Sequence, residues 1–448
     1  MDAVSPLEHR YGRAEMKAVW TETARLRYLL EVESALAWAH SELGTIPKLA
    51  AARIAKAAAS KKVTPERVKA IEAEIKHDLM AVVKALAEQA GDAGRFVHLG
   101  ATSYDTIDTA NSLQFGDGLK QVRTGLRRLL KALLALAKKH RRTPMLGRTH
   151  GQAAVPITFG LKMAVYASEV GRHLERLAEL EKRVLVGKMS GATGTMAAFR
   201  GKGMQVQELV CKRLGLAPVT ASTQIVQRDR YVELFSFLAN VATSLEKFAT
   251  EVRTLQRTEI GEVAEGFDAK KQVGSSTMPQ KQNPIVSEQV TGLARYARAH
   301  LVPVWENAVQ WNERDLANSA PERFIHPTVF ILVDHSLHQL AKVFETLRVF
   351  PARMRENLGR AQGLMMAESL MITLTESGMG RQEAHELSRQ AAMKTIAKHG
   401  HYRDACLATP AIVKALGKKG VEKALDPRNY VGEVDAIIAK VVAETKAL

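Results

Sequence analysis

The sequence VRTGLRRLLKALLALAKK, residues 122–139, decides the fold of this chain. Its apolar side chains recur every three, four or seven residues, which places them on one face of an α-helix. These residues are Val122, Leu126, Leu129, Leu130, Leu133 and Ala137. Arginine and lysine side chains occupy positions between them. The segment is therefore predicted to be an amphipathic helix whose apolar face packs against partner helices.

Two longer stretches, residues 219–260 and 328–350, contain neither glycine nor proline, so each can hold a long helix. A helix of forty residues is about 60 Å long, so one small domain cannot cover its apolar face. No convincing two-residue alternation is present, and little β-sheet is expected. We therefore predict an all-α chain of three helical domains, with a central long-helix bundle completed by other subunits. The predicted domains are residues 1–110, residues 111–363 and residues 364–448.

The 448-residue chain carries an unusual excess of positive charge, because 64 lysines and arginines oppose 47 aspartates and glutamates, giving +17. This excess fits a polyanion partner, an anionic substrate or an ordinary solvated surface. The longest apolar run, residues 132–137, is far too short to span a membrane. The N-terminal residues lack the apolar core of a signal peptide. Cys211 and Cys406 share no short motif, so a cytoplasmic location without a disulfide framework is expected.

The segment GSSTMPQKQNP, residues 274–284, combines hydroxyl, amide and lysine side chains and leads into a predicted helix that carries Glu288. Backbone N–H groups around Ser275 and Ser276 can form an anion-binding nest. The same donors can stabilise a serine alkoxide, and Lys281 can neutralise a carboxylate or a developing carbanion. The alternative is a surface loop with ordinary turn chemistry.

Three further polar segments are candidates for chemistry. GRTHGQ opens a loop predicted for residues 147–160, where His150 is either a general acid–base or a hydrogen-bonded structural histidine. HLGATSYD, residues 98–105, reads on its own as a helix N-cap region. The segment at residues 311–319, followed by Arg323, suits carboxylate or phosphate binding, although surface ion pairs have the same composition.

Together these segments resemble the fumarase/aspartase superfamily, whose serine loop reads Gly-Ser-Ser-x-Met-Pro-x-Lys-x-Asn. Residues 274–283 match this loop in full. Within the superfamily the chain looks most like the adenylosuccinate lyase family, because fumarase and argininosuccinate lyase usually carry Leu after the histidine that corresponds to His150. The resemblance covers nearly the whole chain and implies a fumarase/aspartase-like fold. Other matching segments are Arg10-Tyr11, His77-Asp78, Ser222–Gln224, Gln227–Asp229, Glu259–Val263 and Trp311–Arg323.

The resemblance implies an anti β-elimination that releases fumarate from adenylosuccinate, giving AMP, and from the succinylaminoimidazole-carboxamide ribotide of purine biosynthesis. Ser275 would remove the proton beside a succinyl carboxylate. His150 would protonate the departing nitrogen, with its imidazole held by Glu288. Lys281, the fourth catalytic residue, and Asn283 would bind the succinyl carboxylates.

The resemblance also implies a set of substrate-binding residues. Thr102 and Ser103 would hold the succinyl end, whereas others would meet the phosphate and nucleotide. The full set is Arg10, Tyr11, Lys76, His77, Asp78, His98, Thr102, Ser103, Thr149, Gln224, Ser276, Met278, Asn283, Arg314, Ser319 and Arg323. No metal or organic cofactor is implied. The expected partners are a small anionic nucleotide and three further copies in a homotetramer with shared sites, without membrane or nucleic-acid binding.

Several positions depart from the usual family pattern, which affects substrate contacts more than the type of reaction. They are Lys76, Tyr104, Gln280, Gln282 and Asn312. Two alternatives remain open: a sister enzyme such as argininosuccinate lyase or carboxymuconate cycloisomerase, and a basic helical nucleic-acid-binding protein. Most of the +17 charge has no function assigned from the sequence.

Overall fold

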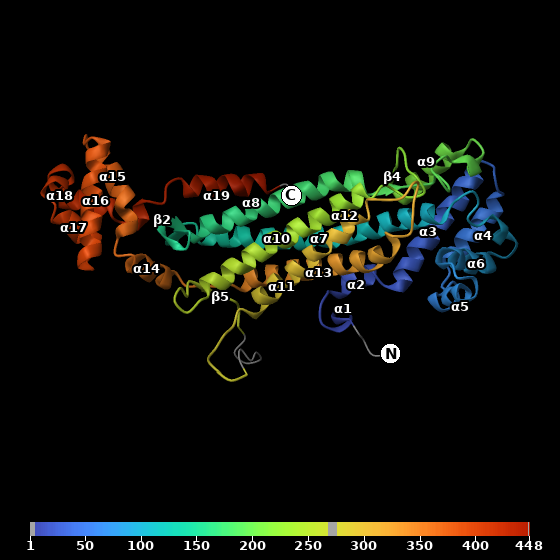
Figure 1. The fold of residues 1–448 in the computed structure, drawn as a ribbon, viewed down its shortest axis with the longest axis horizontal. Coiled ribbons are helices and arrows are strands. Elements are labelled where there is room, and N and C mark those ends of the chain that lie inside the picture. Colours follow the sequence, from blue (N-terminus) through green and yellow to red (C-terminus); the bar gives the residue numbers. More distant parts are fainter. Residues whose placement is uncertain (1–4, 268–275, 447) are drawn as a thin grey trace. The chain divides into compact units, whose positions relative to one another are not determined.

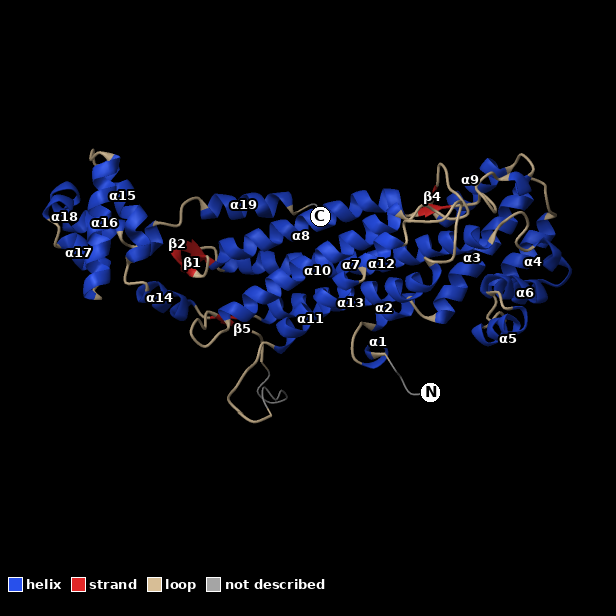
Figure 2. Ribbon diagram, in the orientation of Figure 1, coloured by secondary structure: helices blue, strands red, loops and turns tan. Residues whose placement is uncertain are grey.

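The computed structural model describes residues 5–267, 276–446 and 448. Its regular structure is almost entirely helical, and the strands of the described residues pair only in two-stranded sheets (Figure 2). The all-α fold class is therefore confirmed. The chain divides into two compact units. The first comprises residues 1–126, 173–245 and 292–338, and the second comprises residues 127–172, 246–291 and 339–448. The division into three domains stays a prediction.

Five long helices contribute residues to both units: α7 (Ser103–Lys139), α8 (Phe159–Val184), α10 (Asp229–Leu255), α11 (Ile285–Ala299) and α13 (Ser319–Thr346). The helices that lie wholly in the first unit are α1 (Pro6–His9), α2 (Ala14–Val19), α3 (Glu22–Glu42), α4 (Lys48–Ala59), α5 (Pro65–Ile75), α6 (Asp78–Ala90), α9 (Gly203–Leu214) and α12 (Leu301–Glu306). Those of the second unit are α14 (Pro351–Arg360), α15 (Ala367–Glu376), α16 (Arg381–Lys398), α17 (Tyr402–Leu407), α18 (Pro410–Ala424) and α19 (Val434–Glu444). The strands are β1 (Pro144–Thr149), β2 (Gln152–Thr158), β3 (Val186–Gly187), β4 (Ala217–Pro218), β5 (Val263–Ala264) and β6 (Arg348–Val349).

The long helices fall where the sequence predicts them, with one informative difference. Helix α7 has 37 residues and spans about 55 Å at 1.5 Å per residue. Helix α13 begins at Ser319, well before the proline-free stretch that starts at Thr328. Pro321 lies in its first turn, where a backbone N–H has no helical partner, so proline does no harm there. Pro327 lies inside the helix and removes one backbone hydrogen bond.

Glycines inside α7 let α13 approach closely within the first unit. A Cβ atom on Gly118 would lie 2.7 Å from the Phe330 ring, and one on Gly125 would lie 3.0 Å from Cβ of Leu337. These residues recur seven positions apart on both helices, which is the repeat of one helix face packing on another. Glycine, usually unfavourable inside a helix, is therefore required here by packing.

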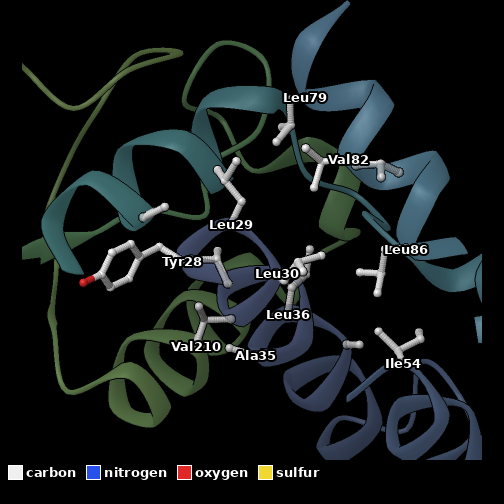
Figure 3. Packing of buried hydrophobic residues seen from close by; sticks show 14 of the residues in the cluster. Tyr28, Leu29, Leu30, Ala35, Leu36, Ile54, Leu79, Val82, Leu86 and Val210 are labelled. Atoms are coloured by element: carbon white, nitrogen blue, oxygen red, sulfur yellow. The ribbon is translucent and has the colours of Figure 1, made fainter. Parts of the chain in front are cut away.

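The N-terminal helices of the first unit form their own core. Helix α3 packs on α4 and α9, and α5 packs on α6 (Figure 1). Leu36, Ile54 and Leu86 are almost completely buried between them, and Figure 3 shows these side chains meeting. Burying each such side chain contributes about 1.5–3 kcal/mol. This core fixes the helix N-termini that surround the pocket described below.

In the second unit, α15, α16, α17 and α18 pack around Leu370, Tyr402 and Ile412 (Figure 1). The hydroxyl of Tyr402 is 2.7 Å from the Ser388 hydroxyl, so the buried phenol has a hydrogen-bond partner. None of the helices in the described part of the chain is both long enough and apolar enough to cross a lipid bilayer.

Candidate functional site

A cavity of about 610 Å³ lies in the first unit. Four helices begin at its wall: α3 after the cap Thr21, α6 after the cap His77, α7 at Ser103 and α13 at Ser319. Helix N-termini carry partial positive charge and unpaired N–H groups, which attract anions. Many of the sequence-predicted binding residues line this pocket together. They are Lys76, His77, Asp78, Ser103, Arg314, Ser319 and Arg323.

The link between α5 and α6 brings three of these residues to the wall. Lys76 ends α5 in a left-handed conformation with φ of 55°. The next residue, His77, caps α6 by accepting a hydrogen bond from the Met80 N–H at 3.3 Å. The Asp78 carboxylate forms an ion pair with the guanidinium of Arg323 in α13, with 2.6 Å between Oδ2 and Nη2. The three predicted residues thus form a turn that is tied to the opposite side of the pocket.

Tyr104, a departure from the family pattern, supports two predicted ligands. The guanidinium of Arg314 lies 3.7 Å from the centre of the Tyr104 ring, and the Tyr104 hydroxyl is hydrogen-bonded to the Ser319 side chain. Burial raises the pKa of Tyr104, so the phenol stays neutral. Arg314 also donates to the side chain of Gln224 at 2.9 Å, which connects this predicted residue to the pocket. Tyr104 therefore orients Arg314 and Ser319.

A buried ionic network that sequence reasoning missed lies behind this wall. Arg228 is fully buried and pairs with Asp108 at 2.9 Å and with the pocket residue Glu322 at 2.6 Å. Burial lowers the pKa of the Arg228 guanidinium, but the two carboxylates raise that pKa by more than burial lowers it. Arg228 is therefore charged. One turn earlier on α7, Asp105 pairs with buried Lys188. The signal in the sequence was a pair of aspartates, Asp105 and Asp108, three residues apart near the start of a long helix.

Other predicted residues of the first unit do not line the pocket. The backbone N–H of Thr102 donates to the Asp105 carboxylate at 2.8 Å, so the helix-cap interpretation of this segment is confirmed. His98 lies 2.7 Å from Glu33, whose side chain is fully buried. Burial lowers the pKa of His98, but the neighbouring carboxylate raises it by more, so the net direction is upward.

Arg10 and Tyr11 lie at the start of the described chain. The Tyr11 ring contacts His335 of α13 edge-on, with ring centres 5.7 Å apart, and the guanidinium of Arg10 lies 5.9 Å from the centre of the Tyr11 ring. The N–H of Gly12 donates to Nδ1 of His335 at 3.2 Å. This segment is thus anchored on α13, but neither predicted residue lines the pocket.

In the second unit, the prediction of a loop at residues 147–160 is wrong for most of these residues. Strands β1 and β2 form an antiparallel hairpin in which Thr149 pairs with Gln152. Only His150 and Gly151 remain in the turn, with φ of 53° and 76°. Two central residues with positive φ define the type I′ turn, whose twist matches that of the strands. This turn presents Thr149 and His150 to solvent.

Arg148 anchors the hairpin immediately before this turn. Its guanidinium makes two hydrogen bonds to the fully buried carboxylate of Glu262, at 2.9 and 3.0 Å. Asn357 of α14 donates to the same carboxylate at 2.8 Å. Arg148 and Glu262 lie in segments quoted for the family resemblance, but neither residue was assigned a role from the sequence. Such a bidentate pair fixes direction as well as distance, so it positions the turn that carries His150.

Described residues on either side of the serine-loop motif are held together by hydrogen bonds. Ser275 lies outside the described residues. Glu265 caps α11 by accepting hydrogen bonds from the N–H and hydroxyl of Ser287 at 2.7 and 2.6 Å. Gln256 joins both ends of the loop, because it accepts from the Glu265 N–H at 2.9 Å and donates to the Gln282 carbonyl at 3.0 Å.

The remaining predicted residues of this region are mostly exposed: Ser276, Met278, Lys281 and Glu288, with Asn283 half-buried. Glu288 lies in the first turn of α11. Within the described chain, no hydrogen bond or ion pair joins His150, Lys281 and Glu288 to one another. Among its described residues, one copy of the chain therefore brings many of the predicted pocket residues together but leaves His150, Lys281 and Glu288 unconnected.

Comparison with known proteins agrees with this architecture. Residues 10–298 match the protein family described as "Lyase", which places the chain in that class of enzymes. The 3-carboxy-cis,cis-muconate lactonizing enzyme of Pseudomonas putida has the same fold, with a TM-score of 0.89 and 34% identity over 98% of both chains. The fumarase/aspartase-like fold is thereby confirmed.

The particular family follows from the remaining matches. Residues 363–441 match "Adenylosuccinate lyase C-terminus". Adenylosuccinate lyase of Pyrococcus horikoshii is 50% identical over 98% of this chain and 97% of its own. That of Methanocaldococcus jannaschii is 45% identical over 99% of this chain and 96% of its own. The chain belongs to the adenylosuccinate lyase family.

Proposed function

We propose that this chain cleaves adenylosuccinate to fumarate and AMP, and cleaves the succinylaminoimidazole-carboxamide ribotide by the same anti β-elimination. One structural observation supports the nucleotide substrate more than any other: four helix N-termini and several cationic side chains converge on one pocket. A phosphate group suits such a site because it accepts many hydrogen bonds and carries a double negative charge. Relatives with 50% identity favour this reaction over that of the lactonizing enzyme, which shares 34%.

In this proposal, Ser275 removes a proton beside a succinyl carboxylate and Lys281 stabilises the charge that develops there. His150 protonates the leaving nitrogen, and Glu288 holds the imidazole in the required tautomer. Asn283, Ser276, Met278 and the residues of the pocket bind the substrate. His150 suits a general acid because its two-residue turn exposes the ring on a rigid hairpin.

We further propose a homotetramer in which neighbouring copies complete each site. His150 and Glu288 are both exposed, and neither reaches the other within one chain. A large apolar surface in the first unit supports a partner: Val309, Trp311, Leu316 and Phe324 are 70–77% exposed. Large apolar side chains that are exposed close together in a sequence segment are typical of residues that a partner covers. The free, buried cysteines Cys211 and Cys406 agree with the cytoplasmic location proposed from the sequence.

The test is the fall in ultraviolet absorbance when adenylosuccinate is cleaved, with fumarate measured independently. We expect Ser275→Ala and His150→Ala each to lower kcat by several orders of magnitude, while His399→Ala retains normal activity. His399 is a matched control because it is also exposed and also has a positive φ, at 48°. No fumarate from the wild-type protein would refute the proposed reaction.

Shared sites predict that mixing the two inactive variants restores activity, because some sites in a mixed tetramer then contain neither substitution. Sedimentation should show the tetramer, and mass spectrometry should show that it is mixed. A confirmed mixed tetramer without recovered activity would contradict sharing.

A further inference from the structure

Arg25 of α3 is a pocket residue without an assigned role. It lines the 610 Å³ cavity and also a smaller one of about 190 Å³ that borders it along α5 and α6. The side chain is half-buried in the first unit. No described residue accepts a hydrogen bond or forms an ion pair with its guanidinium. Burial lowers its pKa, and the neighbouring charge of Arg323 lowers it further, whereas Asp78 opposes this.

Most of the carboxylates that line the pocket already form ion pairs with other side chains. Glu22 pairs with Lys69 at 2.6 Å, Asp78 with Arg323 at 2.6 Å and Glu322 with Arg228 at 2.6 Å. Among the described residues of the wall, Glu72 is the one carboxylate without an ion pair. By contrast, three described cations of the wall, Arg25, Lys76 and Arg314, are without an ion pair. The pocket therefore has an uncompensated excess of positive charge.

A cation held beneath a protein surface without a counter-ion is costly, because burial removes its hydration. An anion that enters the pocket removes this cost and gains charge-assisted hydrogen bonds. We propose that Arg25 is a direct ligand of the substrate's phosphate and acts beside Arg323. This inference rests on the proposed function for the nucleotide. A phosphate dianion fits two arginines and converging helix N-termini better than a single carboxylate does.

The test uses Arg25→Gln and Arg25→Lys in the full-length protein, with Arg27→Gln as the matched control. Arg27 lies on the same helix but is exposed, and its guanidinium lies 4.6 Å from the centre of the Tyr28 ring. Calorimetry would measure the binding of AMP, adenosine and fumarate. We expect Arg25→Gln to weaken AMP binding by about ten- to a hundred-fold, as expected for lost hydrogen bonds to a charged group, and to leave adenosine and fumarate unchanged. Arg25→Lys should lie between, and Arg27→Gln should match the wild type.

Thermal unfolding separates this role from a structural one. Without ligand, Arg25→Gln should unfold at the wild-type temperature or above, because a half-buried charge without an ion-pair partner has been removed. With AMP, the rise in unfolding temperature seen for the wild type should shrink. A destabilised Arg25→Gln protein whose preference for AMP over adenosine is unchanged would overturn the proposal. If Arg25→Gln does not fold, unchanged AMP affinity in Arg25→Lys overturns it.

Comparing AMP with fumarate also shows which anionic group of the substrate contacts Arg25. If Arg25→Gln weakens fumarate binding but not AMP binding, Arg25 faces the succinyl carboxylates and the phosphate assignment is wrong. Failure of the wild type to cleave adenylosuccinate would refute the proposed function, yet its preference for AMP over adenosine would still report on the phosphate site. The two failures are therefore distinguishable.

Discussion

Removing the guanidinium of Arg148 should destabilise the second unit strongly. Arg148→Met keeps the length and apolar stem of the side chain but leaves the buried carboxylate of Glu262 with Asn357 as its remaining side-chain donor. Removing one partner of a buried ion pair typically costs about 3–5 kcal/mol. Arg128 provides a matched comparison, since it makes the same two-bond contact with Glu345, at 2.6 and 2.8 Å, but both side chains are more than one-third exposed. Arg128→Met should cost less than about 1 kcal/mol.

Urea denaturation followed by circular dichroism would measure both free-energy changes. The Glu262→Gln variant completes a double-mutant cycle, and the combined substitution should cost about 2–3 kcal/mol less than the sum of the single ones. Because His150 follows Arg148 by two residues, displacement of the turn should also lower kcat, by about a hundred-fold for a 1 Å shift. Equal effects of Arg148→Met and Arg128→Met on stability, or additive effects in the cycle, would refute the role assigned to this ion pair.

Two other predictions concern pH and the serine loop. The raised pKa of His98 means that its pairing with Glu33 contributes stability that is fully present below about pH 6.5, its ordinary pKa, and is lost as pH rises through the higher pKa of the folded state. The difference in unfolding free energy between the wild type and His98→Gln should therefore be larger at pH 6 than at pH 8.5, and a constant difference would contradict this. Gln282→Lys would place a charge where the Gln282 amide now accepts a 2.6 Å hydrogen bond from Arg348. Repulsion should loosen the loop base and lower kcat about tenfold, an order-of-magnitude estimate for one lost charge-assisted hydrogen bond, whereas Gln280→Lys, at an exposed position, serves as the control.

Hydrophobic periodicity was a reliable guide to the helices but not to the hairpin at β1 and β2. The stripe from Val122 to Ala137 lies in α7 as predicted. The hairpin was missed because its turn, His150-Gly151, replaces the usual Asn-Gly signal with a residue whose positive φ is uncommon. The start of α13 was missed because prolines near a helix N-terminus resemble helix breakers in the sequence.

For the candidate site, too, some residues could be predicted from the sequence and others could not. The motifs identified Lys76 to Asp78, Ser103, Arg314, Ser319 and Arg323, which the structure brings to one pocket. Arg25 and Arg228 were not assigned roles, because a single arginine, on helix α3 or just before α10, has no distinctive spacing. Their importance depends on burial and on partners that are distant in the sequence.

The all-α class, the long helices and the family could be predicted from the amino-acid sequence, because periodicity and motif spacing are local properties of the chain. The pairing of charges could be learned only from the folded structure. Asp78 is neutralised by Arg323, 245 residues away, whereas Arg25 has no ion-pair partner among the residues that the structure describes. The reason is physical: the energy of a charge depends on its burial and on the groups that surround it in space, and neither quantity can be read from sequence order.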